Sequence, residues 1–129
     1  MRTDGEVLIP LYKEHGPGFA HHLEGEFAIA VYDFRNGLAV FATDPFKTKP
    51  LFINGIECAS YRSGVGGEKA EPNEIRITNL DGLVLDRMPV RRWDLSQWKE
   101  TYEDWITAFE SAVAARAKHG CFIGLSSGY

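Results

Sequence analysis

Cysteine is scarce in this sequence: Cys58 and Cys121 are the only two among 129 residues. Two cysteines cannot form the multiple-disulfide framework that stabilises small secreted domains. Each of them stands among apolar neighbours, a setting typical of a buried free thiol. We therefore expect two free, buried thiols without a catalytic role, in a protein of the cytoplasm.

Long apolar runs and blocks of like charge are missing as well. No stretch approaches the roughly 18 apolar residues of a transmembrane helix, and the opening residues, MRTDGEVLIP, lack the apolar core of a secretory signal. The net charge is −4, and the pair Arg91-Arg92 is too short to form a basic patch. We therefore expect neither a membrane nor a nucleic acid as the main partner.

The overall composition is that of a globular protein. Hydrophobic residues make up 44% of the chain and charged residues 25%, which argues against a disordered chain. The length suits either one ordinary domain or parts of two domains.

Most of the chain is predicted to form three β-hairpins. In each, two short apolar segments flank an Asn-Gly or Asp-Gly dipeptide, the sequence typical of a tight hairpin turn. The pairs are 26–34 with 38–44, 50–53 with 56–60, and 74–80 with 83–87. In the first strand Phe27, Ile29 and Val31 alternate with Ala28 and Ala30, which indicates that both faces of the sheet are covered.

The helical signals near the N-terminus are shorter. Apolar residues follow a helical period over residues 5–14, with Asp4 available as the N-cap and Pro10 close to the first turn. A second short helix is expected over 19–23. The glycine-rich segment 61–73 is expected to be a loop.

Beyond residue 88 the character of the sequence changes. Residues 101–120 predict an amphipathic helix, with Thr101 and Asp104 as a capping-box pair and Gly120 as the residue that ends it. The apolar run 121–125 predicts a buried strand. A helix followed by such a strand is typical of the start of an α/β domain.

The turn that follows, GLSSG at 124–128, has three interpretations. Gly-x-Ser-x-Gly is the nucleophile elbow of α/β-hydrolases, with Ser126 as nucleophile, but in that fold the histidine follows the serine and here every histidine precedes it. Alternatively, a strand followed by a Ser/Gly turn can cradle phosphate, with a hydroxyl donor from Ser126 and close backbone approach at Gly128. An ordinary loop is the third interpretation.

Four segments, in the right order, resemble motifs of the glutamine-hydrolysing asparagine synthetase family. LEGEFAIAVYD (23–33) resembles Leu-x-Gly-x-Phe-Ala-x-Ala-x-x-Asp, and TDPFKTKPLF (43–52) resembles Asp-x-Phe-Gly-x-Lys-Pro-Leu. DGEVLIPLYKEHG (4–16) is similar to the family's Asp-x-Glu helix, and LSSGY (125–129) to the start of its Ser-Gly-Gly-x-Asp-Ser pyrophosphate loop.

The resemblance implies an α+β fold built from parts of two domains. Stacked antiparallel sheets with helices, as in N-terminal-nucleophile (Ntn) hydrolases, would be followed by the first helix and strand of an α/β ATP-pyrophosphatase domain. The implied division is a partial type 2 glutamine amidotransferase domain at 1–88, a linker at 89–100, and the truncated start of an asparagine synthetase ATP-binding domain at 101–129.

The resemblance also implies an activity for the intact enzyme: an amide is made from a carboxylate, typically that of aspartate, with glutamine-derived ammonia, ATP and Mg²⁺. Asp4 matches the position that holds the α-amino group of glutamine, although a helix N-cap explains it equally well. The positions that match the ATP-binding loop are Leu125, Ser126, Ser127 and Gly128.

No catalytic residue or metal ligand is expected within these 129 residues. In the family the nucleophile is an N-terminal cysteine, which we expect upstream of residue 1, and the Mg²⁺-binding aspartate comes after Gly128. We therefore expect no tightly bound cofactor here, and neither glutamine hydrolysis nor aspartate activation by this chain alone.

The sequence departs from the family pattern at several positions. Lys47 and Ser127 replace glycines, Thr43 stands where arginine is usual, and Lys49-Pro50 is retained, with a role that we expect to be structural. Two other hypotheses remain open. One is a cyclase of the β-lactam or lasso-peptide type from the same superfamily; the other is a non-catalytic assembly module, as a homodimer or with a second chain that completes the synthetase domain.

Overall fold

The computed structural model describes residues 4–94, 96, 98–117, 120 and 124. The chain divides into two compact units, Met1–Trp93 and Asp94–Tyr129. Among the described residues, the first unit contains both sheets and most of the helices, and the second contains one helix.

The larger sheet of the first unit, sheet A, is antiparallel with strand order β1-β2-β6-β7. Its strands are β1 (Ala28–Asp33), β2 (Leu38–Thr43), β6 (Glu74–Asn79) and β7 (Val84–Pro89). In the register, Val31 pairs with Val40, and Phe41 pairs with Arg76. The first and third predicted hairpins are therefore confirmed, and β2 joins them side by side in one sheet.

The smaller sheet, sheet B, has the order β4-β3-β5 and is also antiparallel. Its strands are β3 (Phe52–Asn54), β4 (Glu57–Ala59) and β5 (Glu68–Lys69). The second predicted hairpin is confirmed as β3 and β4.

The prediction of a loop over 61–73 is wrong in part, because this segment contains the short helix α2 (Arg62–Val65) and the strand β5. Gly66 ends α2 in the left-handed conformation, with φ 63°. At Gly67 a Cβ would lie 2.0 Å from the carbonyl oxygen of Ile53. The two glycines thus allow a helix end and a close strand pairing within a few residues.

The N-terminal helical segment consists of the 3₁₀-helix η1 (Asp4–Val7), α1 (Leu8–His15) and the 3₁₀-helix η2 (Gly16–His22). Pro10 is the third residue of α1, where its missing N–H costs no helical hydrogen bond. Asp4 does not cap α1, contrary to expectation: the N-cap position is occupied by Val7, and no side chain caps it. The 3₁₀ turn of η1 moves the start of the α-helix three residues along the chain, from the predicted residue 5 to Leu8.

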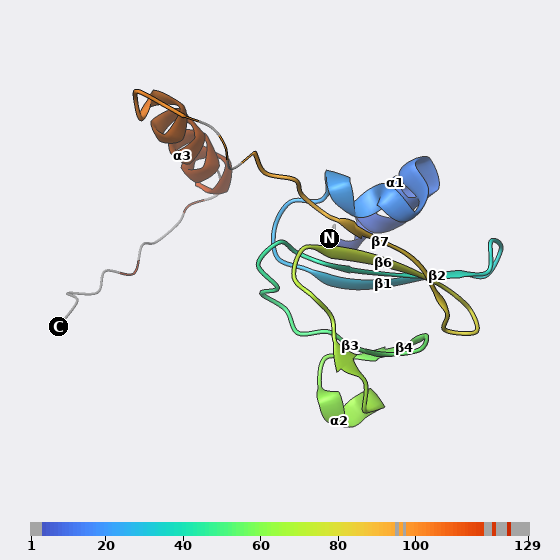
Figure 1. The fold of residues 1–129 in the computed structure, drawn as a ribbon. Coiled ribbons are helices and arrows are strands. Elements are labelled where there is room, and N and C mark those ends of the chain that lie inside the picture. The colour runs from blue at the N-terminus through green and yellow to red at the C-terminus, as the bar shows by residue number, and fades with distance from the viewer. Residues whose placement is uncertain (1–3, 95, 97, 118–119, 121–123, 125–129) are drawn as a thin grey trace. The chain divides into compact units, whose positions relative to one another are not determined.

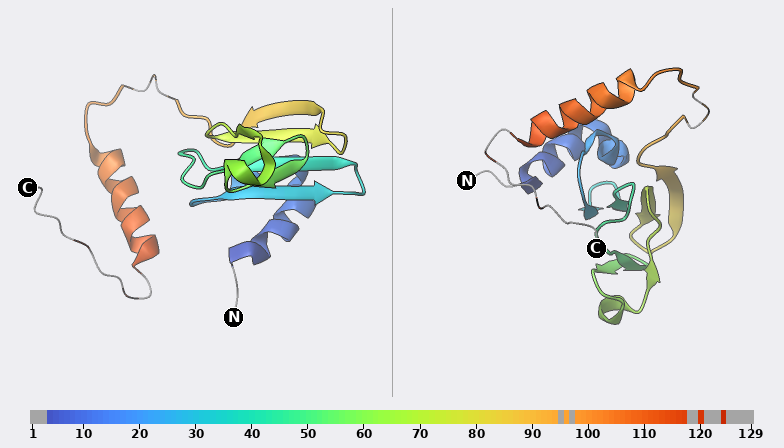
Figure 2. Two further views of the ribbon diagram at one scale, coloured as in Figure 1. Left: turned by 90° about the horizontal axis from the view of Figure 1, so that it is seen from below. Right: turned by 90° about the vertical axis from the view of Figure 1, so that its left-hand side faces the viewer.

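The first unit has three layers, as Figures 1 and 2 show: α1 and η2 cover one face of sheet A, and sheet B covers the other. Strand β2 lies at the centre of both cores. Val40 and Ala42 pack toward the helices, whereas Ala39 and Phe41 pack toward sheet B. Burial of a side chain such as Phe41 stabilises the fold by roughly 1.5–3 kcal/mol. The prediction that both faces are covered is confirmed, as is an α+β fold with antiparallel sheets.

The second unit contains α3 (Glu103–Arg116) within the predicted helix 101–120. The predicted capping box is wrong, because Tyr102 occupies the N-cap position and Asp104 instead forms an ion pair with Lys99. The helix ends at Arg116, so Gly120 does not end it. Of the predicted strand 121–125, Gly124 is not in a strand and the other residues lie outside the described part of the chain. Among the helices of the described residues, none combines the length and apolar character needed to cross a membrane.

Candidate functional site

The residues predicted to bind substrates lie at the two ends of the chain. Asp4 is the first residue of η1, directly before α1. The predicted ATP-binding residues Leu125, Ser126, Ser127 and Gly128 lie outside the described residues. The geometry that the structure does describe belongs to the two central motifs.

These two motifs meet at what we call the motif junction, formed by residues 26–27 and 44–49. The backbone N–H of Asp44 donates to the carbonyl oxygen of Phe27 over 3.0 Å, and the N–H of Phe27 donates to the Asp44 carboxylate over 3.1 Å. Nearby, Lys49 Nζ lies 2.9 Å from Glu26 Oε2. Both side chains of this ion pair are more than half exposed, so the pair contributes little stability. The expected structural role of Lys49 fits this contact.

The Asp44 carboxylate organises the junction. Asp44 is 1% exposed, and besides the Phe27 N–H its oxygens accept bonds from the N–H of Phe46, at 2.9 Å, and from the N–H and hydroxyl of Thr48, at 3.1 and 2.6 Å. Burial pushes the pKa of Asp44 upward, but the bonds from Thr48, Phe46 and Phe27 outweigh it, so the net effect is a lowered pKa. Asp44 is therefore an ionised structural acceptor whose bonding capacity is already used.

The departure at Lys47 has a conformational consequence. Lys47 has φ 52°, in the left-handed region where glycine is favoured. Its N–H donates to the carbonyl oxygen of Asp44 over 3.0 Å, which holds the turn. Lys47 thus adopts a conformation that glycine adopts without strain.

A second acidic residue, Asp33, ends the first motif. Its carboxylate accepts bonds from the N–H groups of Arg35 and Asn36, from the Asn36 side chain and from the Tyr12 hydroxyl, the last at 3.2 Å. The bonds from Asn36 lower the pKa of Asp33 most. Burial, together with the charge of Asp33, raises the pKa of Tyr12 to about 12. Both residues line a cavity of ≈ 540 Å³ between α1 and β1 that has largely apolar walls.

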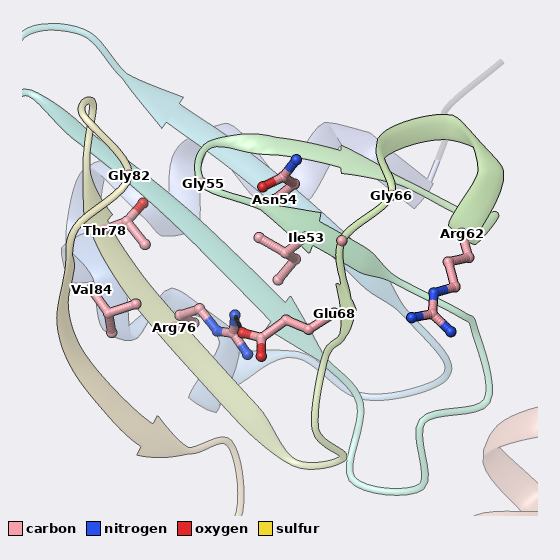
Figure 3. Close-up of a pocket in the computed structure, with 11 residues that line it drawn as sticks. Ile53, Asn54, Gly55, Arg62, Gly66, Glu68, Arg76, Thr78, Gly82 and Val84 are labelled. Carbon is pink, nitrogen blue, oxygen red and sulfur yellow. Dashed lines mark hydrogen bonds and ion pairs between the residues drawn. The ribbon is translucent and has the colours of Figure 1, made fainter.

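A four-residue ionic network joins the two sheets: Glu74, Arg76 and Arg87 come from sheet A and Glu68 comes from β5 of sheet B. The Arg76 side chain is 4% exposed and pairs with both Glu68 and Glu74. Arg87 Nη1 lies 2.8 Å from Glu74 Oε1, and Arg87 Nη2 lies 3.8 Å from Glu68 Oε1. Two of these residues, Glu68 and Arg76, also line a second cavity of ≈ 470 Å³ (Figure 3). The network neutralises charges that would otherwise be costly to bury.

The thiol that the structure describes, Cys58, is free and half-buried, so the expectation of full burial is wrong for this residue. Its Sγ lies 3.8 Å from the hydroxyl of Tyr32, which also donates to the carbonyl oxygen of Ile56 over 2.5 Å. Cys58 lies within β4 and therefore cannot be an N-terminal nucleophile. Cys121 lies outside the described residues.

Sequence reasoning missed the ionic network and the bond between Tyr12 and Asp33. The network had a usable signal, because Glu74 and Arg76 are two apart on a strand and must share a face. The hydrogen bond between Tyr12 and Asp33 depends on how α1 packs against β1, and the sequence has no comparable signal for that packing. In the described part of the chain no group of three metal-ligating side chains comes together.

Comparison with known protein families shows to which family this chain belongs. The sequence model of the glutamine amidotransferase domain family matches residues 1–91, which is most of the first unit and more than half of the chain. The chain belongs to the glutamine amidotransferase domain family. The matched range contains Asp4, the motif junction and the ionic network.

Curated relatives extend the similarity. A glutamine-hydrolysing asparagine synthetase of Asparagus officinalis is 32% identical over 125 residues, which cover 88% of this chain and 21% of the relative. Asparagine synthetase 2 of Bacillus subtilis is 40% identical over 55 residues, covering 43% and 7% of the two chains. An amidase of Penicillium rubens, chyE, is 36% identical over 55 residues, covering 43% and 8%.

The amidotransferase chain thus spans about a fifth, or less, of the length of these relatives. No solved structure matches it closely enough to establish a relationship.

Proposed function

We propose that this amidotransferase chain is part of an asparagine-synthetase-like enzyme, which makes an amide from a carboxylate with ammonia released from glutamine. Glutamine and water give glutamate and ammonia; the acceptor carboxylate, in our proposal that of aspartate, reacts with ATP to give an acyl-adenylate and pyrophosphate; ammonia then displaces AMP. Glutamine, ATP and an acidic amino acid are the substrates, and Mg²⁺ neutralises charge on the pyrophosphate leaving group.

One observation supports this proposal above the others. The similarity to the Asparagus asparagine synthetase covers 88% of the chain, whereas the amidotransferase family matches residues 1–91. The similarity to a synthetase therefore continues beyond the amidotransferase region. This favours residues 1–88 as amidotransferase domain, 89–100 as linker and 101–129 as the beginning of an ATP-binding domain.

In this proposal the chain contributes binding groups and the nucleophilic cysteine is supplied from elsewhere. Asp4 holds the α-amino group of glutamine at the start of η1. The segment Leu125 to Gly128 begins the pyrophosphate loop, in which Ser126 contributes a hydroxyl donor. The motif junction holds the start of β1 against the loop after β2.

The test is an assay of the purified protein, as its gene encodes it, with glutamine, aspartate, ATP and Mg²⁺. We expect glutamate, asparagine, AMP and pyrophosphate in equal amounts, and neither glutamate nor AMP from residues 1–129 alone. A cyclised product without glutamate formation would identify the cyclase instead. A protein that forms none of these products would contradict an enzymatic function and favour an assembly module.

The role of Asp4 is tested by Asp4→Asn, with Glu6→Gln as the matched control. Glu6 is exposed in the same 3₁₀-helix, so both variants remove one negative charge from η1. We expect Asp4→Asn to raise the KM for glutamine and to leave asparagine synthesis from added ammonium salt unchanged. Equal effects of the two variants would show that Asp4 does not contact glutamine.

A further inference from the structure

The ≈ 470 Å³ cavity lies on the sheet B side of the first unit, away from the face on which α1 packs. Its walls are the hairpin turn at Asn54 and Gly55, the segment from α2 to β5, and side chains of β6 and β7. Asp4 precedes α1, which packs on the other face of sheet A. Its volume falls within the range of small-molecule pockets, roughly 300–1,000 Å³.

The charges around the cavity do not cancel. Arg62, Glu68 and Arg76 are the charged residues that line it, which leaves one positive charge in excess. Glu74 and Arg87, behind Arg76, cancel each other. Because the whole protein has a net charge of −4, this positive site is a local feature and does not reflect a general attraction for anions.

The excess charge belongs to Arg62. Arg76 already pairs with Glu68 and Glu74, whereas the Arg62 guanidinium has no hydrogen bond or ion pair with any of the residues that the structure describes. Figure 3 shows Arg62 extending from α2 on one side of the cavity and the Arg76–Glu68 pair on another. A guanidinium presents a planar fork of N–H donors that matches a carboxylate in two parallel hydrogen bonds.

We propose that this cavity binds a small molecule with one carboxylate, and that Arg62 is its charged contact. Asn54 supplies a polar group from the hairpin turn: its amide nitrogen donates to the carbonyl oxygen of Val65 over 3.0 Å, which leaves the amide oxygen as an acceptor for an N–H or O–H of the ligand. Ile53 and Val84 supply apolar contacts. The site stands on geometry independent of the proposed synthetase activity.

Glu68 opposes binding in this proposal. Its side chain is 63% exposed and contributes the only negative charge of the lining. Replacement by glutamine raises the excess positive charge from one to two and leaves a side chain of the same size. If the cavity binds a carboxylate, this change should raise its affinity for the ligand. If the network is purely structural, the change should only lower the stability of the protein.

The test is a titration of ¹⁵N-labelled protein with sodium acetate, compared with sodium chloride at equal ionic strength and followed by the amide signals of Gly66 and Gly67. We expect the Gly66 and Gly67 amide signals to shift saturably with acetate. Chloride should not shift these signals in a saturable way. Arg62→Ala should weaken acetate binding roughly tenfold or more, because a charge-assisted pair is lost. Arg62→Lys should restore part of the affinity, and Glu68→Gln should tighten binding a few-fold.

Arg92→Ala is the matched control, since Arg92 is exposed and its side chain has no hydrogen bond or ion pair within the described part of the chain. It should bind acetate as the unchanged protein does. Equal shifts with acetate and chloride, or unchanged binding in Arg62→Ala, would overturn the proposal. Binding that depends on Arg62 but is weakened by Glu68→Gln would also contradict it, because Glu68 would then be a ligand contact.

Discussion

Phe27 and Asp44 bind each other reciprocally: the Asp44 N–H donates to the Phe27 carbonyl oxygen over 3.0 Å, and the Phe27 N–H donates to the Asp44 carboxylate over 3.1 Å. The two residues come from separate sequence motifs, one before β1 and one after β2. Their contact closes the end of the hairpin opposite its turn. The family motifs are therefore joined through a buried carboxylate.

Asp44→Asn should destabilise the first unit by about 2–3 kcal/mol, because an amide retains one acceptor and directs an NH₂ group toward buried donors. The pKa of Asp44 is lowered in the folded protein, so its stabilisation is present above the unfolded value near 3.9 and is lost as the pH falls through the folded value. Urea unfolding between pH 2 and pH 7 should therefore show a flatter acid dependence for the variant.

Asp86→Asn is the control for this measurement, because Asp86 is exposed on β7 and loses the same charge. It should unfold much as the unchanged protein does at neutral pH. If Asp44→Asn and Asp86→Asn gave equal stabilities, the junction would not depend on the carboxylate.

Lys47→Gly should stabilise the first unit by up to about 1 kcal/mol. A left-handed conformation costs a residue with a Cβ roughly 1–2 kcal/mol, and the greater freedom of glycine in the unfolded chain offsets only part of this gain. Lys47→Val should destabilise by more than about 1 kcal/mol, since a β-branched residue fits this region poorly. Urea midpoints of the three proteins should therefore fall in the order glycine, lysine, valine; any other order would contradict a strained Lys47.

The hairpins were predictable because their signals are local. Asn36-Gly37 and Asn54-Gly55 specify turns, and alternation along β1 and β2 specifies faces, so the register followed without tertiary information. The small strand β5 was missed because its two residues carry no periodic signal. It forms only because Gly67 permits β3 to approach, which depends on the tertiary structure.

The candidate sites were less predictable because their residues come from distant parts of the sequence. Asp4 could be assigned by resemblance, but the lining of the ≈ 470 Å³ cavity comes from β3, α2, β5, β6 and the turn before β7. No single stretch of sequence contains that arrangement. Thr101 and Asp104 illustrate the opposite error: a local pattern was present, but Tyr102 occupies the N-cap position of α3 and Asp104 pairs with Lys99.

Arg76→Met should destabilise the first unit by about 2–4 kcal/mol, because Glu74 stays buried and retains only Arg87 as a charged partner. The double variant Glu74→Met with Arg76→Met should be less destabilised than the single variant, since no uncompensated charge is then buried. Chemical unfolding of the two single variants and the double variant measures the coupling. Additive effects would show that the pair does not act as a unit.

Tyr12→Phe should cost about 0.5–1.5 kcal/mol at neutral pH, because the bond to Asp33 is lost in a partly buried site. The pKa of Tyr12 is raised to about 12, chiefly by burial and also by the charge of Asp33, so the hydroxyl contributes stability that is fully present below pH 10 and is lost as the pH rises toward 12. The difference in unfolding free energy between the two proteins should therefore shrink over this interval. Tyr61→Phe is the control, because Tyr61 is 76% exposed. A Tyr12→Phe difference that stayed constant from pH 8 to pH 12 would show that the hydroxyl does not titrate differently in the folded and unfolded states.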